Sequence, residues 1–267
     1  MTSTLHTPAG IAYDRAGPRS GLPVVLLHAG VADRRMWNPQ WSAITARHDA
    51  VRLDLRGFGE STAPPHGALC PVDDVIDTLT ALGIIRCHLV GASFGAGVAV
   101  EVALTRPDLV ESLLLVAPGG SLIAEATPDL QSFVEAERSA LARDDLDAAV
   151  EANVAWWVDG PKRNVGVVHS AVRDAVGQMQ RRAFEVTAGW GDVDECELDP
   201  PALDRLDEIL ARTLVLVGGL DLDAIQVAVR RVTEGIPNAQ RVDWPDTAHL
   251  PSMERPDDFL GLLNDWW

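Results

Sequence analysis

The chain has 267 residues, 47% of them hydrophobic, enough to bury one large core. Its formal net charge of −17 would repel phosphates, which argues against nucleic acid and anionic membranes as partners. No apolar run approaches the roughly 20 residues of a membrane span, and no basic start followed by an apolar stretch opens the chain. We therefore expect a cytoplasmic protein, monomer or homodimer, whose partner is a small-molecule substrate.

The cysteines agree with that location. Cys70, Cys87 and Cys196 are odd in number and widely spaced, which favours reduced thiols over a disulfide framework. Cys87 lies in an apolar run and is expected in the core. His-Glu-x-x-His and Cys-x-x-Cys do not occur in the chain, so the sequence implies no metal. We expect no cofactor.

Predicted strands and helices alternate along the chain, the pattern of a parallel sheet covered by helices. Residues 4–15 are expected to form a β-hairpin. Further strands are predicted at 22–27, 50–55, 87–90, 112–117, 213–217 and 240–244, with helices near 40–47, 72–83, 96–105, 223–235 and 256–267.

Residues 121–194 interrupt this alternation, because they hold charged helical stretches and no run typical of a buried strand. We predict that 121–194 is a helical cap inserted into an α/β core made of residues 1–120 and 195–267. The simpler interpretation is a set of longer surface helices.

The predicted strand at 87–90 runs into residues 91–95, which read Gly-Ala-Ser-Phe-Gly and lead into a helix. Gly-x-Ser-x-Gly at this place is typical of a nucleophile elbow, where a strained turn raises the serine hydroxyl above the sheet. A dinucleotide-binding loop is the alternative, but Gly-x-Gly-x-x-Gly is absent; Gly57-Phe58-Gly59 comes closest, and Thr62 replaces its third glycine. Ser93 is the predicted nucleophile.

A nucleophilic serine needs a histidine base and a carboxylate that orients it, in the chain order serine, acid, histidine. Only His169 and His249 follow Ser93, and His249 lies in the loop after the last predicted strand, where catalytic groups gather. Asp221 follows a buried strand at its carboxyl end, the edge where α/β sheets build their sites. Asp223 is a rival that could instead cap a helix. We predict Asp221 as the acid and His249 as the base.

Two backbone N–H groups are predicted to form an oxyanion hole. One belongs to Phe94, directly after the nucleophile, and the other to Gly30, in the loop after an early strand. His28 precedes Gly30 and is interpreted as structural rather than catalytic.

Large aromatic residues suggest a substrate pocket. Trp37, Trp157 and Trp190 are its candidate walls, and for each the alternative is ordinary core packing. Residues 179–182 include two arginines that could meet a substrate carboxylate. The alternative for these arginines is a solvated helix face.

In combination, these motifs resemble the α/β-hydrolase fold superfamily. The resemblance rests, in chain order, on His28-Ala29-Gly30, residues 54–61, the serine turn, Asp221 and residues 249–256. It departs at Ala29, where most relatives carry glycine. It implies an α/β fold with a mostly parallel eight-stranded sheet flanked by helices and a helical cap insertion. Among small bacterial serine hydrolases, residues 33–37 and 157–161 are similar to the 3-oxoadipate enol-lactonase-like type.

These features predict a serine hydrolase that cleaves a small carboxylic ester or an (enol-)lactone through an acyl-enzyme intermediate. Three alternatives stay open. The same triad could hydrolyse a carbon–carbon bond in a ring-fission product, or could use peroxide as cofactor-free haloperoxidases do. The fold could also serve as a ligand-binding receptor without turnover.

Overall fold

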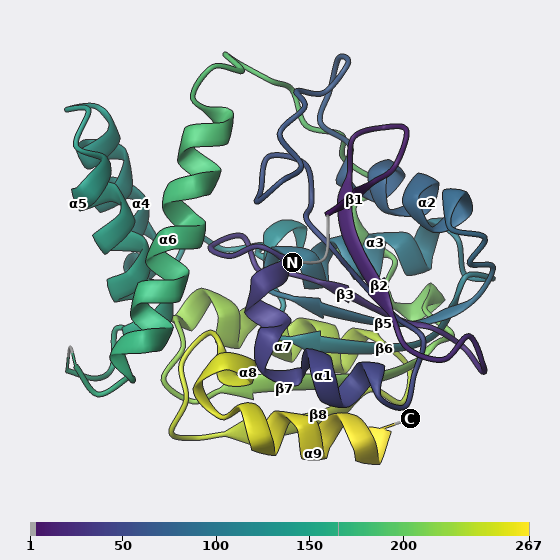
Figure 1. Ribbon diagram of the computed structural model, residues 1–267. Helices are drawn as coiled ribbons and strands as arrows, with labels where there is room; N and C mark the ends of the chain where they lie inside the picture. The colour runs from purple at the N-terminus through teal and green to yellow at the C-terminus, as the bar shows by residue number, and fades with distance from the viewer. Residues whose placement is uncertain (1–3, 165, 267) are drawn as a thin grey trace.

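The computed structural model describes residues 4–164 and 166–266, and its centre is an eight-stranded sheet (Figure 1). The strands follow one another across the sheet in the order β1-β2-β4-β3-β5-β6-β7-β8. Their bounds are β1 Leu5–His6, β2 Ala12–Ala16, β3 Val24–Leu27, β4 Ala50–Leu53, β5 Cys87–Ala92, β6 Val110–Val116, β7 Arg212–Gly218 and β8 Gln240–Trp244. β1 and β2 form an antiparallel hairpin, β2 pairs antiparallel with β4, and the remaining pairs are parallel. The predicted mostly parallel eight-stranded sheet is confirmed.

The register of the central strands decides where their loops emerge. Leu27 of β3 pairs with Gly91 of β5, and Gly91 pairs with Leu115 of β6. The carboxyl ends of these three strands therefore lie level, and the loops after them open at one edge of the sheet. Parallel strands buried on both faces read as continuous apolar runs, which is why these strands could be located from sequence.

Helices cover both faces of the sheet. They are α1 Asn38–Thr45, α2 Pro71–Ala81, α3 Phe94–Thr105, α4 Pro128–Leu141, α5 Leu146–Asn153, α6 Ser170–Thr187, α7 Asp223–Gly235, α8 Pro251–Glu254 and α9 Pro256–Trp266. Short 3₁₀ turns are η1 Arg34–Trp37, η2 Gly120–Leu122, η4 Ala202–Asp204 and η5 Leu206–Glu208, and η3 Val154–Asp159 is a π-helical turn. Helices α1 and α9 pack against each other in front of the sheet in Figure 1, and α2 and α3 pack together behind it.

Helices α4, α5 and α6 stand together at the left of Figure 1, beside the sheet rather than on it. They come from residues 121–194, and the described residues of that range contain no strand. The range also touches the core, because α4 contacts α7. We call residues 121–194 the helical segment.

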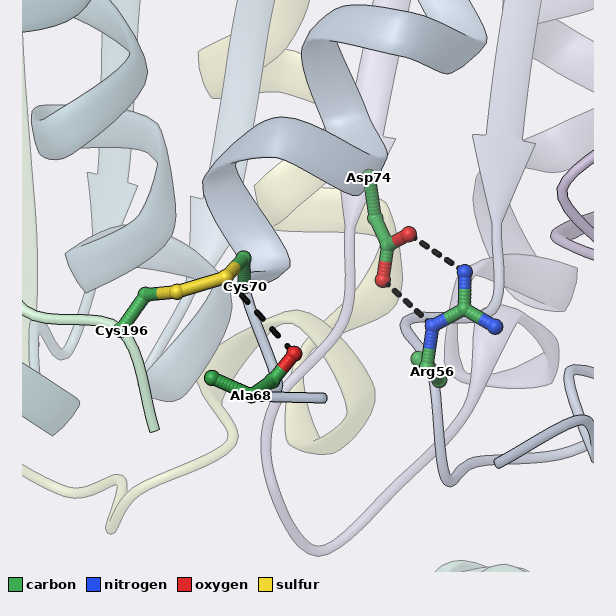
Figure 2. Close-up of a disulfide and its surroundings, with 5 residues drawn as sticks. All are labelled: Arg56, Ala68, Cys70, Asp74 and Cys196. Carbon is green, nitrogen blue, oxygen red and sulfur yellow. Dashed lines mark hydrogen bonds and ion pairs between the residues drawn. A yellow bond between two sulfur atoms is a disulfide. The ribbon is translucent and has the colours of Figure 1, made fainter. Parts of the chain in front are cut away.

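A disulfide joins Cys70 to Cys196, whose Cα atoms lie 4.9 Å apart (Figure 2). Our expectation of reduced thiols is wrong for this pair. Leu69 N–H donates to Asp194 O at 2.7 Å and Cys196 N–H donates to Leu69 O at 2.9 Å, and this local pairing brings together two cysteines 126 residues apart. The thiol argument for a cytoplasmic location therefore no longer applies.

Cys87 alone behaves as predicted. It is fully buried in β5, and burial raises the pKa of its thiol to about 12, so it is inert at neutral pH.

Candidate active site

Ser93 stands at the turn between β5 and α3, with a backbone φ of +51° and ψ of −114°. A non-glycine residue in such a region costs about 1–3 kcal/mol and stays there only when its surroundings hold it. The Ser93 N–H donates to Val116 O at 2.8 Å. The Ser93 carbonyl accepts the N–H groups of Ala96, Gly97 and Gly119 at 2.9, 3.1 and 3.1 Å. The strained turn is thus fixed by β6, by the loop after β6 and by the first turn of α3.

The two glycines of the turn are sterically required. A Cβ at Gly91 would lie 2.3 Å from the carbonyl oxygen of Gly95, and a Cβ at Gly95 would lie 2.5 Å from that of His28. Contacts this short do not occur between real Cβ atoms and backbone, so α3 can approach β3 and β5 only with glycine here. The Gly-x-Ser-x-Gly pattern therefore has the close-packed geometry expected of a nucleophile elbow.

Asp221 and His249 meet in the interior. His249 Nδ1 lies 2.8 Å from Asp221 Oδ2, and the two side chains are 1% and 0% exposed. The other carboxylate oxygen of Asp221 accepts the N–H of Leu222 at 2.7 Å, which fixes the orientation of the carboxylate. Leu220 N–H donates to Thr247 O at 2.9 Å and ties the two loops together.

The hydroxyl of Ser93 is directed towards the loop after β6: a Cβ at Gly119 would lie 3.1 Å from Ser93 Oγ. In the described part of the chain, the side-chain hydrogen bond of His249 runs to Asp221 and not to Ser93. The structure therefore joins the predicted acid and base directly, and the described residues show no hydrogen bond from either of them to the predicted nucleophile. Such bonds are often long without substrate and tighten when it binds.

The rival residues have structural roles. His169 is exposed and caps α6, because its Nδ1 accepts the N–H of Ala171 at 3.1 Å. Asp223 begins α7 and forms an ion pair with Lys162 at 2.9 Å. The imidazole of His249 is bonded to Asp221 rather than to Asp223.

His28 is fully buried, and burial lowers the pKa of its imidazole from 6.5, so the ring is neutral. Its Nε2 accepts the N–H of Leu55 at 2.9 Å, and its Nδ1 must then carry the proton and donate to Ala29 O at 2.8 Å. His28 thereby links the loop after β3 to the loop after β4, which agrees with its structural interpretation.

Gly30 and Phe94, the predicted oxyanion donors, are neighbours. A Cβ at Gly30 would lie 3.4 Å from the Cβ of Phe94. Phe94 is the first residue of α3, and N–H groups in a first turn have no acceptor within their helix. Ala29, by contrast, is fully buried and directs its N–H to Met36 Sδ at 3.3 Å.

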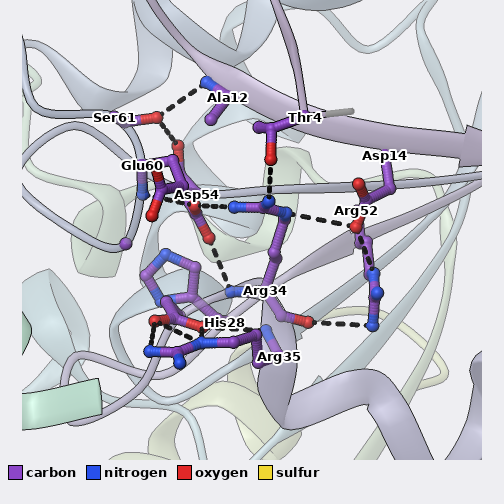
Figure 3. A network of polar contacts seen from close by, with 12 residues as sticks. Thr4, Ala12, Asp14, His28, Arg34, Arg35, Arg52, Asp54, Glu60 and Ser61 are labelled. Atoms are coloured by element: carbon purple, nitrogen blue, oxygen red, sulfur yellow. Dashed lines mark hydrogen bonds and ion pairs between the residues drawn. The ribbon is translucent and has the colours of Figure 1, made fainter. Parts of the chain in front are cut away.

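A buried ionic network supports the loop that carries Gly30 (Figure 3). The Asp54 carboxylate accepts the N–H groups of Arg34 and Glu60, both at 2.8 Å, and binds the Arg34 guanidinium. Burial raises the pKa of Asp54. A Cβ at Gly59, where φ is +51°, would lie 2.3 Å from Asp54 Oδ2, so the carboxylate occupies the space of a side chain. In the sequence, residues 54–61 contribute only to the family resemblance, and no motif predicts that Asp54 supports the loop that carries Gly30.

The three candidate pocket tryptophans lie in different places. Trp157 is 4.4 Å from His249 between ring centroids, directly at the candidate site. Trp37 is fully buried and stacks on Phe259 of α9 at 6.0 Å, so its observed neighbour belongs to the core. Trp190 packs on the loop at Gly57, where an added Cβ would lie 3.3 Å from its ring. The structure gives the pocket assignment of Trp37 and Trp190 no support.

Residues 179–182 differ in whether their side chains have partners. Arg181 is paired with Asp147 and Arg182 donates to Gly59 O at 3.2 Å, so both arginines have protein partners. Gln180 is buried, and its Oε1 has no hydrogen-bond partner within residues 4–164 and 166–266.

A cavity of about 600 Å³ lies beside Phe94 along α3. Its wall includes the carboxylates of Glu101, Glu195 and Glu197 and reaches the disulfide at Cys196. Burial raises the pKa of Glu101. Three carboxylates make this cavity unfavourable for an anionic group.

Residues 4–164 and 166–266 contain neither a metal-ligand cluster nor a membrane-spanning helix. No group of three or more His, Cys, Asp or Glu side chains there could hold a metal ion. No helix in the same ranges is long and apolar enough to cross a membrane.

Comparison with known proteins places the chain in a family. A model described as the alpha/beta hydrolase family matches residues 24–262. The chain belongs to the alpha/beta hydrolase family. The matched region contains the Ser93 turn, Asp221 and His249, and both the fold and the superfamily inferred from sequence are confirmed.

Individual relatives are more distant. Over 118 residues the chain is 36% identical to RutD, a provisionally assigned carbamate hydrolase of Caulobacter vibrioides; the match covers 42% of this chain and only 44% of that relative. A solved thermophilic esterase from Thermogutta terrifontis, with malate bound, is 26% identical, with 98% and 95% of the two chains covered and a TM-score of 0.74. The enol-lactonase of Burkholderia xenovorans is 23% identical, with 96% and 95% covered and a TM-score of 0.72, and this likeness concerns the fold alone.

Proposed function

We propose that this alpha/beta hydrolase is a serine hydrolase that cleaves a small carboxylic ester or an (enol-)lactone through a Ser93–His249–Asp221 triad. The observation that carries the proposal is the buried 2.8 Å contact between His249 Nδ1 and Asp221 Oδ2, at the sheet edge where the strained Ser93 turn emerges. An aspartate buried beside histidine serves to hold the imidazole and to stabilise its protonated form. The esterase among the solved relatives supports the same class of reaction.

In the proposed reaction, His249 Nε2 takes the Ser93 proton while Ser93 Oγ attacks the substrate carbonyl. The bond between the carbonyl carbon and the leaving oxygen then breaks, and His249 returns the proton to that alcohol or enol. Water attacks the acyl-enzyme by the reverse sequence and releases the acid. The N–H groups of Gly30 and Phe94 would bind the oxyanion, and losing such a donor typically lowers kcat about 10²–10³-fold.

We propose that the helical segment acts as the cap over this centre. Two contacts support the proposal: Trp157 faces His249, and Met179 of α6 accepts the N–H of Asp33, in the loop that carries Gly30. A cover of this kind excludes water and shapes the acyl and alcohol pockets.

We take the cavity beside Phe94, the residue after Ser93, as the approach for substrate, and its charges favour a substrate without an anionic group. The cavity beside Phe94 carries three carboxylates, and Arg181 and Arg182 are engaged by the protein. The arginines of the helical segment are therefore weak support for an acidic substrate, and a neutral ester or lactone fits these surroundings better.

A carbamate is the second candidate substrate, favoured by the 36% identity to RutD over part of the chain. The same triad chemistry applies, because a carbamate carbonyl is also attacked by a serine and its amine or alcohol is the leaving group. Only the pocket distinguishes the two.

The test compares wild type with Ser93→Ala on short p-nitrophenyl esters, a panel of small lactones, and simple carbamates. Turnover that is lost in Ser93→Ala supports the triad, and the preferred substrate ranks ester against lactone and carbamate. Turnover that survives in Ser93→Ala would refute the proposed nucleophile. A folded wild type without turnover on any of these substrates would shift weight to carbon–carbon cleavage or to a binding role.

A further inference from the structure

A short stretch of the helical segment, residues 157–163, lies directly on both loops that carry the candidate acid and base. It begins in the π-helical turn η3, which ends at Asp159 and is followed by Gly160 with φ of +81°. Single π-helical turns are frequent at functional sites. We call residues 157–163 the clasp.

The turn of the clasp fits between the two loops. A Cβ at Gly160 would lie 2.8 Å from Leu220 O and 2.9 Å from Ala248 Cβ. Leu220 immediately precedes Asp221, and Ala248 immediately precedes His249. The backbone of the clasp therefore occupies a gap too narrow for any side chain, in contact with both loops.

Lys162 holds the acid loop. Its Nζ donates to the carbonyl oxygen of Asp221 at 2.9 Å and pairs with the carboxylate of Asp223 at 2.9 Å. These two bonds attach the clasp on either side of Leu222, whose N–H fixes the Asp221 carboxylate.

Arg163 holds the histidine loop through Glu254 of α8. The Arg163–Glu254 ion pair measures 2.7 Å, and each side chain is only 8% exposed. Glu254 Oε1 accepts the N–H of Ala248 at 2.8 Å, one residue before His249. Arg163 also donates to the carbonyls of Val158 and Asp159 within the clasp. A buried ion pair can contribute little net stability, so the position of this pair between the clasp and the histidine loop is its more informative property.

Trp157 of the clasp contacts His249 itself, with the two ring centroids 4.4 Å apart. It packs in turn edge-to-face on Phe133 of α4 at 5.1 Å. The position of the His249 imidazole is thus restricted by the packed ring of Trp157 and by the bond from Nδ1 to Asp221.

We propose that the clasp positions Asp221 and His249 for proton transfer, with Arg163 and Glu254 as its positioning residues. The proposal rests on the proposed function, because it assumes that these two residues are the acid and base. Displacement of a catalytic group by about 1 Å can cost about 10²-fold in rate, so loosening the clasp should act on the chemical step.

The decisive variants are Arg163→Met and Glu254→Gln, which keep side-chain length and remove the ion pair. The carboxamide introduced by Glu254→Gln would still offer an oxygen to Ala248 N–H, so this variant is the milder one for folding. For each we expect kcat to fall roughly 10–100-fold while KM changes less than about twofold. Arg163→Lys, which restores the charge, should recover part of kcat. The double variant should be no worse than the worse single variant, because both changes break one interaction.

Arg255→Gln is the matched control. Arg255 follows Glu254 in sequence, but its side chain is 36% exposed. Among the described residues its ion pairs go to Asp246 and Asp258, at 3.0 and 2.7 Å, and neither partner bonds the N–H of Ala248. Its kcat should match wild type. An equal loss of kcat in Arg255→Gln and Arg163→Met would overturn the proposal, because breaking an exposed ion pair would then have the same effect as breaking the clasp.

A second measurement needs no substrate. Proton NMR reports the hydrogen on His249 Nδ1 that is bonded to Asp221, identified as the downfield signal that disappears in His249→Gln. We expect this signal to broaden through faster exchange in Arg163→Met and Glu254→Gln and to stay sharp in Arg255→Gln. If wild type turns over none of the substrates, the proposed function fails and the signal still tests the clasp. A folded Arg163→Met with a wild-type signal and wild-type kcat would overturn the clasp alone.

Discussion

Nε2 of His28 accepts the backbone N–H of Leu55 at 2.9 Å, so a histidine in the loop that leads to Gly30 fixes that loop to the one after β4. This bond exists only while Nε2 is unprotonated. The imidazole is fully buried, and the pKa of His28 is lowered from 6.5 by that burial. The neutral ring is therefore a requirement of the fold.

The first prediction concerns pH. Below about pH 6.5 the unfolded chain protonates His28 and the folded chain does not, so the free energy of unfolding should decrease as pH falls through this range. The slope from one such group is at most about 1.4 kcal/mol per pH unit. His28→Gln should be less stable overall but should lack this contribution. Urea unfolding of both proteins at pH 7 and pH 5.5 checks it, and equal pH dependence in the two would refute the role of His28.

The second prediction concerns the Asp54 brace. Gly59→Ala would place a Cβ 2.3 Å from Asp54 Oδ2 at a φ of +51°. We expect a loss of at least about 2 kcal/mol in the free energy of unfolding, because strain and displacement of a buried carboxylate add. Gly67→Ala is the control, since φ there is +97° and an added Cβ meets nothing within 4 Å. Similar losses in the two variants would show that backbone strain alone explains the effect.

The third prediction concerns the Oε1 of Gln180, a buried acceptor that has no partner in the part of the chain that the structure describes. A buried acceptor without a partner costs about 1–3 kcal/mol in desolvation, so the similarly sized Gln180→Met should raise thermal stability without substrate. Gln40→Met is the comparison. The Oε1 of Gln40 also has no hydrogen-bond partner among the described residues, but its Nε2 donates to Ser252 O at 2.8 Å. Losing that donor leaves a buried carbonyl unpaired, so Gln40→Met should lower thermal stability. Calorimetric midpoints decide between them. A lower midpoint for Gln180→Met would contradict the unpaired state.

The fourth prediction concerns the disulfide. Joining residues 126 apart lowers the entropy of the unfolded chain, which corresponds to about 4–5 kcal/mol of stability in the chain-entropy model. A thiol reductant should therefore lower the melting temperature of wild type and leave Cys70→Ser/Cys196→Ser unchanged. A wild type that melts at the same temperature with and without reductant would speak against a formed bond.

Most of the core could be predicted from sequence because its strands are buried on both faces. Residues 214–217 of β7 form an unbroken apolar run and are buried. The helix predicted at 223–235 and the strand predicted at 240–244 match the structure to the residue. The predicted and observed starts of α3 differ. The helix begins at Phe94 rather than at Ala96, because the strained Ser93 is its N-terminal cap.

What could not be predicted depends on contacts between distant segments. The disulfide follows from pairing of Leu69 with Glu195, and no local pattern indicates that pairing. No motif singles out Lys162 or Arg163, yet Lys162 binds the carbonyl of Asp221 and Arg163 binds the buried Glu254. Residue type alone does not distinguish Trp37 and Trp190 from Trp157. Their neighbours do, because only Trp157 of the three is observed against His249.

The Cys70–Cys196 bond divides the chain in a way that the ribbon alone does not suggest. Residues 70–196 form a closed covalent ring, and the ring contains Ser93 and the entire helical segment. Asp221 and His249 lie on the open tail outside it. A single proteolytic cut in the exposed turn between α4 and α5 would open the ring without releasing a fragment, and the nicked molecule would separate into two pieces only after reduction.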